Sequence, residues 1–115
     1  MNISFEEIGQ VLVTCQTDEG VEAGKTVKIS GNGKAGPCAA GEQVCGVAVE
    51  TAQDGYAAIQ VKGFIGVPCK DSTVSAGWAE LTADGAGGVK KAGTGDKGRG
   101  ILVMSVEDGQ AVVCL

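Results

Sequence analysis

The clearest pattern along this chain is a series of short apolar runs, many of which alternate with polar residues and end at glycine. Alternation of this kind is typical of β-strands that bury one face. It predicts strands near residues 11–15, 27–29, 44–49, 56–61, 64–68, 78–81, 101–106 and 110–114. No window beyond the first twelve residues supports a long helix, so we predict an all-β fold.

Short turn signals separate these runs. Asn32-Gly33, Asp54-Gly55 and Asp108-Gly109 each join a residue that tolerates positive φ to a glycine, which favours tight hairpin turns. We therefore assign all six residues a structural role at turns.

The order of these features recurs along the chain at a spacing of 53 or 54 residues. The matching segments are Ala23-Gly24 with Ala76-Gly77, Gly46–Val49 with Gly100–Val103, and Asp54-Gly55 with Asp108-Gly109. Two copies are too few for a solenoid. We predict one small, Gly-rich, β-barrel-like domain over residues 11–115, built from two pseudo-repeated halves at about 23–61 and 76–115.

Residues 1–10 lie outside both repeats and differ from them in character. Ser4 and Glu7 fit a helix capping box, and Phe5 and Ile8 have helical spacing. The segment is predicted to be an N-terminal arm, with a short helix as one form. Two behaviours are open: it orders on a partner, or it folds onto the domain.

The composition limits what the core and the surface can do. The chain has 115 residues, of which 43% are hydrophobic but only 3% aromatic, so the core must consist of Val, Ile, Leu, Ala and Cys. Five cysteines without any histidine favour reduced, buried thiols, with Cys45 and Cys114 the clearest cases because both lie in strand patterns. The net charge of −5 argues against nucleic-acid binding. No apolar run is long enough to span a membrane, and the start does not resemble a secretory signal, so we expect synthesis in a cytosol.

Two segments resemble nucleotide-binding loops, but neither meets the requirements. Gly20–Thr26 has three residues between its glycines where a phosphate-binding loop needs four, and a strand pattern follows it. The pattern Gly31-x-Gly33-x-x-Gly36 is followed by Pro37, which disfavours the helix that would receive a pyrophosphate. Without histidine, the chain also lacks the commonest general base. We predict no catalytic, cofactor or metal site, and no enzymatic activity.

Several segments in order resemble a known family. They are Ala23–Gly31, Gly46–Glu50, Val61–Phe64 and Val67-Pro68. Together they are similar to capsid decoration, or cement, proteins of tailed bacteriophages and prophages. The resemblance covers about residues 11–115 and implies a compact β-barrel-like domain, often trimeric, on the outside of an expanded head. The implied partner is the major capsid protein, and the implied location is the virion surface after synthesis in the bacterial cytoplasm. Apolar residues of the arm, Ile3, Phe5 and Ile8, are then the predicted capsid contacts.

A second class of function stays open, which is a small β-barrel module that binds a ligand or a glycan. Glycan sites favour exposed aromatic side chains, and only Trp78 and Tyr56 are candidates. A small enzyme that uses a cysteine or a carboxylate is the least favoured alternative.

Overall fold

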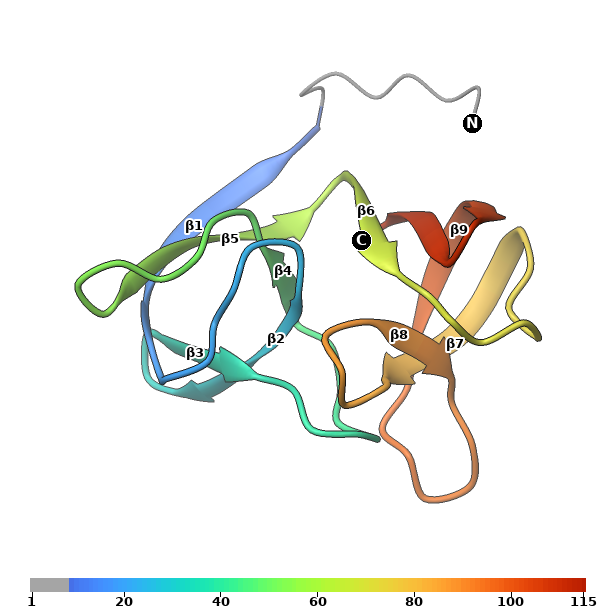
Figure 1. Ribbon diagram of the computed structural model, residues 1–115, viewed down its shortest axis with the longest axis horizontal. Helices are drawn as coiled ribbons and strands as arrows, with labels where there is room; N and C mark the ends of the chain where they lie inside the picture. The colour runs from blue at the N-terminus through green and yellow to red at the C-terminus, as the bar shows by residue number, and fades with distance from the viewer. Residues whose placement is uncertain (1–8) are drawn as a thin grey trace.

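A computed structural model describes residues 9–115, and all regular secondary structure in this range is β (Figure 1). The strands are β1 (Val11–Thr17), β2 (Thr26–Gly31), β3 (Lys34–Pro37), β4 (Gly46–Ala48), β5 (Tyr56–Lys62), β6 (Phe64–Pro68), β7 (Gly77–Ala83), β8 (Val89–Lys91), β9 (Arg99–Glu107) and β10 (Gln110–Cys114). The all-β prediction is confirmed. The predicted arm or helix of residues 1–10 falls mostly outside the described residues, and no helix within residues 9–115 could cross a membrane.

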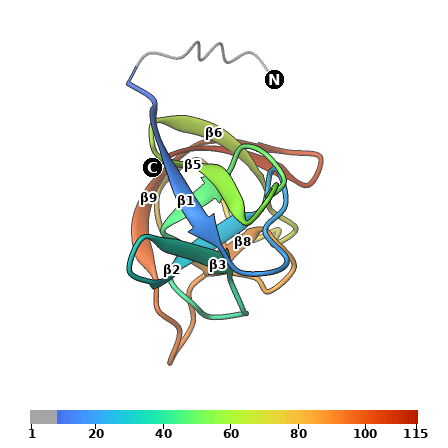
Figure 2. The ribbon, with the colours of Figure 1, turned by 90° about the vertical axis from the view of Figure 1, so that its left-hand side faces the viewer.

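The first five strands form a closed barrel, which faces the viewer in Figure 2. Their order around the barrel is β1-β3-β2-β4-β5, and all neighbours are antiparallel except β1 and β3. This parallel contact closes the barrel and is short, with Gln16 opposite Lys34 and Thr17 opposite Ala35. By contrast, β1 pairs with β5 along most of its length, from Val11 to Gln16.

The last five strands form a second sheet of order β6-β10-β9-β7-β8, which lies beside the barrel in Figure 1. Every neighbouring pair in it is antiparallel. Opened between β1 and β3, the barrel reads β3-β2-β4-β5-β1. Read from its other edge, the second sheet has the order β8-β7-β9-β10-β6. Each of its strands therefore occupies the place of the barrel strand numbered five lower. The structure therefore contains two halves with the same strand order. Each half begins one strand earlier than the repeats predicted at 23–61 and 76–115, with β1 in the first half and β6 in the second.

Backbone conformation repeats in the same way. All the described residues with positive φ except Gly20 and Gly85 fall into six pairs, 54 positions apart or, for the last pair, 53. The pairs are Gly9 and Gly63, Gly33 and Gly87, Gly41 and Gly95, Asp54 and Asp108, Gly55 and Gly109, Gly24 and Gly77. Unusual dihedrals at matching places indicate that the turns, as well as the strands, are duplicated.

The predicted turn residues lie at turns. Asp54 and Gly55 have φ of 54° and 78°, and Asp108 and Gly109 have nearly the same values, 53° and 76°. Positive φ at both central positions is the geometry of a type I′ hairpin turn. At Asn32-Gly33, which joins β2 to β3, only Gly33 has positive φ, at 66°.

Two groups of buried residues form the core, and neither contains an aromatic side chain among the described residues. The barrel encloses Cys15, Val21, Val27, Ala35, Ala48, Ala57 and Ile59. The larger group lies on the inner face of the second sheet, but it also includes Cys38, Val44 and Val47 from the first half. The halves are therefore packed on one another through a shared core. Backbone hydrogen bonds add to this contact, from Thr26 N–H to Gly87 O (3.0 Å) and from Gly41 N–H to Ala83 O (2.9 Å).

The second half is not closed by a strand pairing equivalent to β1 with β3 in the described residues. Instead, β6 and β8 approach one another through other groups. A Cβ on Gly88 would lie 2.4 Å from the Pro68 carbonyl oxygen, so only glycine permits this approach. Asp71, which follows β6, accepts a hydrogen bond from the Lys91 backbone N–H at the end of β8 (3.0 Å). A side chain thus bridges the gap that a strand pairing closes in the barrel.

The structure corrects the expectation for two cysteines. Cys15, Cys38 and Cys69 are buried, but Cys45 and Cys114, the two expected to be most securely buried, are only half-buried. Cys45 precedes β4 rather than lying within it. Cys114 lies in β10 but points away from the core, because its neighbour Val113 faces inward.

Candidate functional site

The predicted contact residues Ile3, Phe5 and Ile8 lie outside the described residues. A candidate site in the rest of the chain can be sought among large apolar side chains that water reaches. These are Val11, Leu12, Val13, Ile29, Val49, Tyr56, Trp78 and Met104. Some of them stand alone on the surface, which is ordinary for soluble proteins, but two groups do not.

The first group lies on the outer face of the second sheet. Trp78 on β7 is opposite Leu102 on β9, and Leu102 is opposite Cys114 on β10. Directly opposite residues share one face of a sheet. The neighbouring Val103 belongs to the core on the other face, so this row points outward.

Exposure is greatest at Trp78, whose side chain is 78% accessible to water. Met104, at 38%, follows Leu102 by two positions on β9 and is the extra residue of a β-bulge opposite β10. We call Trp78, Leu102, Met104 and Cys114 the Trp78 surface. None of the four is an acidic or basic residue. Tryptophan is among the residues most enriched in binding hot spots.

The second group lies on the barrel half, at the start of β1. Val11, Leu12 and Val13 are 44–49% exposed, although they alternate between the two faces of the strand. We call these three residues the β1 surface. The start of β1 extends beyond β3, because β3 pairs only with Gln16 and Thr17. In the described part of the chain, residues 11–15 are therefore paired on one side only.

The backbone of this part of β1 has a free edge. Gln16 N–H donates to Gly33 O next to β3 (3.1 Å), whereas Thr17 N–H donates to Gly55 O next to β5 (2.8 Å). Because successive residues of a strand point their backbone groups to opposite sides, Leu12 and Thr14 face the β3 side. Within residues 9–115, β3 does not reach them. An exposed edge of this kind can accept another strand.

The two aromatic candidates for glycan binding are far apart. Tyr56 opens β5 in the barrel and is 54% exposed, while Trp78 lies on β7 in the second sheet. The start of β5 and the strand β7 lie on opposite sides of the molecule in Figure 1. They therefore do not form one aromatic platform for a sugar.

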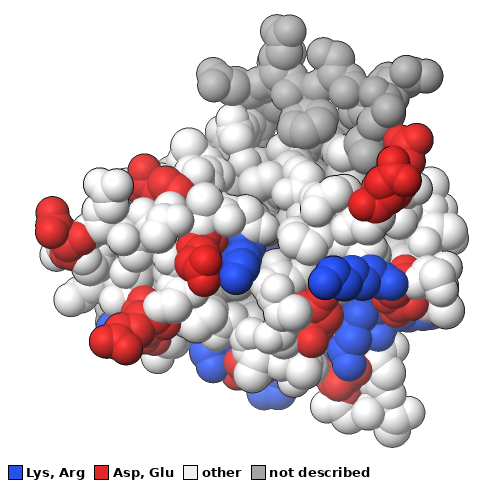
Figure 3. Space-filling model, viewed as in Figure 1, with Lys and Arg blue, Asp and Glu red and all other residues white. Residues whose placement is uncertain are grey.

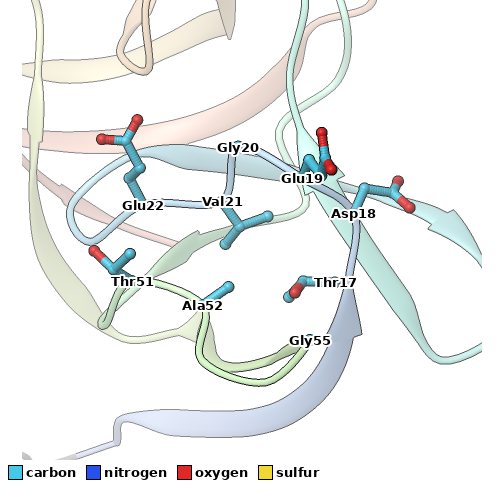
Figure 4. A pocket seen from close by; sticks show the side chains of 9 residues that line it. All are labelled: Thr17, Asp18, Glu19, Gly20, Val21, Glu22, Thr51, Ala52 and Gly55. Atoms are coloured by element: carbon cyan, nitrogen blue, oxygen red, sulfur yellow. The ribbon is translucent and has the colours of Figure 1, made fainter.

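A hollow of about 360 Å³ lies at one end of the barrel (Figure 4). Its floor is apolar, because the side chains of Val21 and Ala52 point into it, while the carboxylates of Asp18 and Glu22 point away. Val21 is 2% exposed and belongs to the barrel core. Val21 therefore fills this end of the barrel, and the hollow does not open into the barrel interior.

Two of the carboxylates that line this hollow form ion pairs. Asp18 lies 3.0 Å from Lys34 Nζ, and Glu22 lies 3.2 Å from Lys25 Nζ. Hydrogen bonds from Ser30 and then Lys34 lower the pKa of Asp18. A proton donor for catalysis would need a raised pKa, so Asp18 is not arranged for that role.

A second hollow, of about 430 Å³, lies where the loop after β3 meets the loop after β8. Lys28 and Glu42 form an ion pair in its wall at 2.7 Å. Their shared hydrogen bond is the main cause that raises the pKa of Lys28 and lowers that of Glu42. Cys38 lies nearby, and burial raises the pKa of its thiol to about 11, so it is protonated at neutral pH and a poor nucleophile.

The segments that resemble nucleotide-binding loops do not have that structure. Gly20–Thr26 joins β1 to β2, and the pattern Gly31-x-Gly33-x-x-Gly36 spans the β2–β3 hairpin, with no helix after either. Across residues 9–115, no three cysteine or acidic side chains converge to hold a metal ion.

Charged side chains are mixed over the surface. On the face shown in Figure 3, acidic side chains are spread over both halves, and most basic side chains lie beside acidic ones. The ion pairs include Lys90 with Asp96 at 3.9 Å, in the region where the sequence has its densest basic cluster. The surface thus has no extended basic face on this side.

Sequence reasoning singled out Trp78 but not the rest of the Trp78 surface, nor the β1 surface. Leu102 and Cys114 lie in apolar segments that are typical of buried strands. The only sequence signal for their exposure was that they alternate with Val103 and Val113 along their strands. Comparison with models of known protein families found no match, and comparison with curated protein sequences found no significant similarity.

Proposed function

We propose that this protein is a structural decoration, or cement, protein of a tailed-bacteriophage head. It binds the major capsid protein on the outer surface of the expanded shell and stabilises that shell, as a homotrimer. It is made in the bacterial cytoplasm and becomes part of the virion exterior. Its role is mechanical and requires no catalytic residue, cofactor or metal.

The observation that supports this proposal best is the kind of surface that the domain presents. A small duplicated β-domain exposes uncharged apolar side chains on two separate surfaces, including a tryptophan that is 78% accessible to water. Large exposed apolar groups mark sites of protein contact. The segments that resemble decoration proteins, Ala23–Gly31 and Gly46–Glu50, lie in the barrel half, at β2 and β4.

The proposed attachment uses Ile3, Phe5 and Ile8, which precede the domain. The point at which they join it is well defined. Gln10 donates a hydrogen bond from its amide to Gln60 Oε1 (2.5 Å), and a Cβ on Gly63 would lie 2.9 Å from Gln10 Cα. Burial of each apolar side chain contributes roughly 1.5–3 kcal/mol before ordering costs. Three arms in a trimer would then bind firmly through avidity.

The test is removal of residues 1–8, with Gly9 and Gln10 retained. Gln10 must stay because Gln60 is fully buried and would lose a partner. We expect a nearly unchanged melting temperature, because the barrel and the second sheet keep their cores. Cosedimentation with expanded phage heads assembled without this protein should fall by about tenfold or more.

The matched control replaces Glu6 and Glu7 with glutamine, which removes charge from the same segment but keeps its apolar residues. This variant should still cosediment with the heads. Wild-type protein that does not bind any expanded head would overturn the proposed function. A truncated protein that binds as well as the wild type would instead move the attachment site to the folded domain.

A further inference from the structure

We propose that in the free protein the first eight residues of the chain lie across the outer face of their own second sheet, with Ile3 and Phe5 against the Trp78 surface. This inference goes beyond the proposed function, because it concerns the protein before it meets a capsid and does not depend on capsid binding. It adds a competition to that function, since the same apolar side chains contact either the sheet or the shell.

The Trp78 surface continues to the edge of the sheet as a row across four strands. Leu102 is opposite both Trp78 and Cys114, and Cys114 is opposite Phe64, the first residue of β6. Directly opposite residues share one face of a sheet. Ile65, the neighbour of Phe64, packs against the core, so Phe64 faces outward with the others. The row therefore runs from β7 to β6 and contains no acidic or basic residue.

The first eight residues join the domain at the Phe64 end of this row. Gly63 comes directly before Phe64, and a Cβ on Gly63 would lie 2.9 Å from Gln10 Cα and 3.1 Å from Gly9 O. Leu115 N–H donates to Gly63 O (3.0 Å), which places the end of β10 at the same point. Figures 1 and 2 show the starts of β1 and β6 on the same side of the molecule.

Two side-chain hydrogen bonds hold this junction in place. The Gln10 amide donates to Gln60 Oε1 (2.5 Å), and the Gln60 amide donates in turn to Phe64 O (3.0 Å). Gln60 is fully buried, so its position is fixed by the surrounding core. Residues 1–8 therefore begin at a defined point, at one end of the apolar row.

The segment is long enough to cover the row. From β6 to β7 the row crosses three spacings between strands, which is about 14 Å. An extended chain advances about 3.3 Å per residue, so Phe5 reaches about 13 Å from Gly9 and Ile3 about 20 Å. The two side chains can therefore contact Leu102 and Trp78.

The internal repeat indicates which face of the segment is apolar. At the spacing of 54 residues, Ile3 and Phe5 match Ala57 and Ile59. Both of these residues are buried and face the barrel core from β5. Positions two residues apart lie on the same face of an extended chain, so Ile3 and Phe5 can contact the row together.

The covalent connection makes a small contact sufficient. Because the segment is tethered at the end of the row, its effective concentration there is high, and no separate partner competes on equal terms. The conformational entropy lost when eight residues become ordered opposes the gain from burial. The docked form is therefore only modestly favoured. This agrees with a melting temperature that changes little on truncation, and it lets the segment transfer to a capsid.

The experiment uses the fluorescence of Trp78, the single tryptophan of the chain, in the absence of capsids. We compare quenching by acrylamide in the full chain and in a chain that lacks residues 1–8. The full chain should emit at shorter wavelength, with a quenching constant about half that of the truncated chain. Phe5→Ser should be quenched like the truncated chain. The matched control, with Glu6→Gln and Glu7→Gln, should be quenched like the full chain.

Thiol labelling gives a second measurement on the same row. Cys114 should react faster in the truncated chain than in the full chain. Cys45 is also half-buried but lies outside the row, so its rate should not change. Equal quenching of Trp78 in the full and truncated chains would overturn the proposal, and so would an unchanged rate at Cys114.

Dilution distinguishes the chain's own segment from that of another copy. Contact within one chain should give the same quenching constant from about 100 μM down to about 1 μM protein. Protection that disappears on dilution would overturn the proposal, because it would indicate the segment of a second copy. Since no capsid is present, failure here is distinct from failure to bind heads.

Discussion

At the scale of single residues, Asp71 has the most specific role. Its carboxylate accepts hydrogen bonds from the Thr73 hydroxyl (2.6 Å) and from the backbone N–H groups of Thr73 and Lys91. The bond to Lys91 links the end of β6 to β8, where the second half lacks the strand pairing that closes the barrel. These bonds, first that of the Thr73 hydroxyl, lower the pKa of Asp71 from 3.8 to about 2.

The lowered pKa predicts how stability depends on pH. Because the pKa is lower in the folded than in the unfolded protein, folding favours the ionised carboxylate. Its contribution is complete above the unfolded pKa near 3.8 and is lost as the pH falls through about 2. In Asp71→Asn one carboxylate oxygen becomes an amide donor, which cannot accept from an N–H group. We expect this variant to unfold about 1 kcal/mol more easily at pH 7, a small value because the site is partly exposed.

Urea denaturation at a series of pH values would measure this effect. The difference between wild type and Asp71→Asn should shrink as the pH falls from 3.8 toward 2. Asp108→Asn removes the same charge at an exposed turn whose positive φ asparagine tolerates, so it should cost little. If Asp71→Asn and the wild type were equally stable at pH 7, the link between β6 and β8 through the Asp71 carboxylate would not contribute to stability.

At the scale of elements, the two Asp-Gly turns are the best conserved part of the internal repeat. At the Asp54-Gly55 turn, the backbone groups of Gln53 and Tyr56 form two hydrogen bonds with each other, of 2.9 and 3.0 Å. Asp108-Gly109 joins β9 to β10 directly. Each glycine has φ close to 77°, and no atom lies within 4 Å of a Cβ added to either. The requirement for glycine is therefore conformational and not steric.

We predict that Gly55→Ala and Gly109→Ala each destabilise the protein by about 1 kcal/mol, the cost of a left-handed conformation for alanine. Gly46→Ala is the contrasting case, because its φ is not positive but its Cβ would lie 2.6 Å from Gln60 O. We expect about 2–3 kcal/mol for this clash in a packed region. Urea midpoints would measure all three. A Gly109→Ala variant as unstable as Gly46→Ala would contradict the explanation from φ alone.

The strands that the sequence did not predict are β3 and β8. β3 has the sequence Lys-Ala-Gly-Pro, whose residues are poor strand formers, and β8 has only three residues. Both become strands because a longer neighbour pairs with them: β2 with β3 and β7 with β8. Pro37 is tolerated at the end of β3, where a missing N–H costs little.

At the scale of the whole molecule, the barrel and the second sheet share one core. Val47 lies on β4 of the barrel, is fully buried, and packs with the core of the second sheet. Thr82 on β7 places its hydroxyl 3.0 Å from the carbonyl oxygens of both Glu42 and Lys97. Arg99 on β9 donates a hydrogen bond to Val44 O (3.2 Å). Contacts of this kind across the boundary make independent folding of either half unfavourable.

We therefore predict that both halves unfold in one transition. Two buried thiols report on them separately, with Cys15 in the barrel core and Cys69 in the core of the second sheet. Pulsed thiol labelling with increasing urea should expose both at the same midpoint. Val47→Ala should reduce the free energy of unfolding by about 2 kcal/mol and shift the urea midpoints of both thiols down by the same amount. Val49→Ala, at an exposed position, is the control and should have little effect. Separate midpoints for the two thiols would indicate two independent units.

The sequence by itself determined the features that depend on local preferences. Alternation of apolar residues established the all-β class, and Asp54-Gly55 and Asp108-Gly109 marked turns whose dihedrals the chain adopts. Both signals are local, because strand period and positive φ depend on a few neighbouring residues. The spacing of these signals was enough to reveal the duplication.

Only the tertiary structure decided which distant residues meet and which faces remain exposed. The parallel contact of Gln16 with Lys34 closes the first half, while Asp71 bridges the second, and nothing local distinguishes these two outcomes. Cys114 and Leu102 look like core residues in the sequence, yet they lie on the outer face beside Trp78. The physical reason is that burial depends on what packs against each face of a sheet, and the inner face of this second sheet is already covered by residues of the first half.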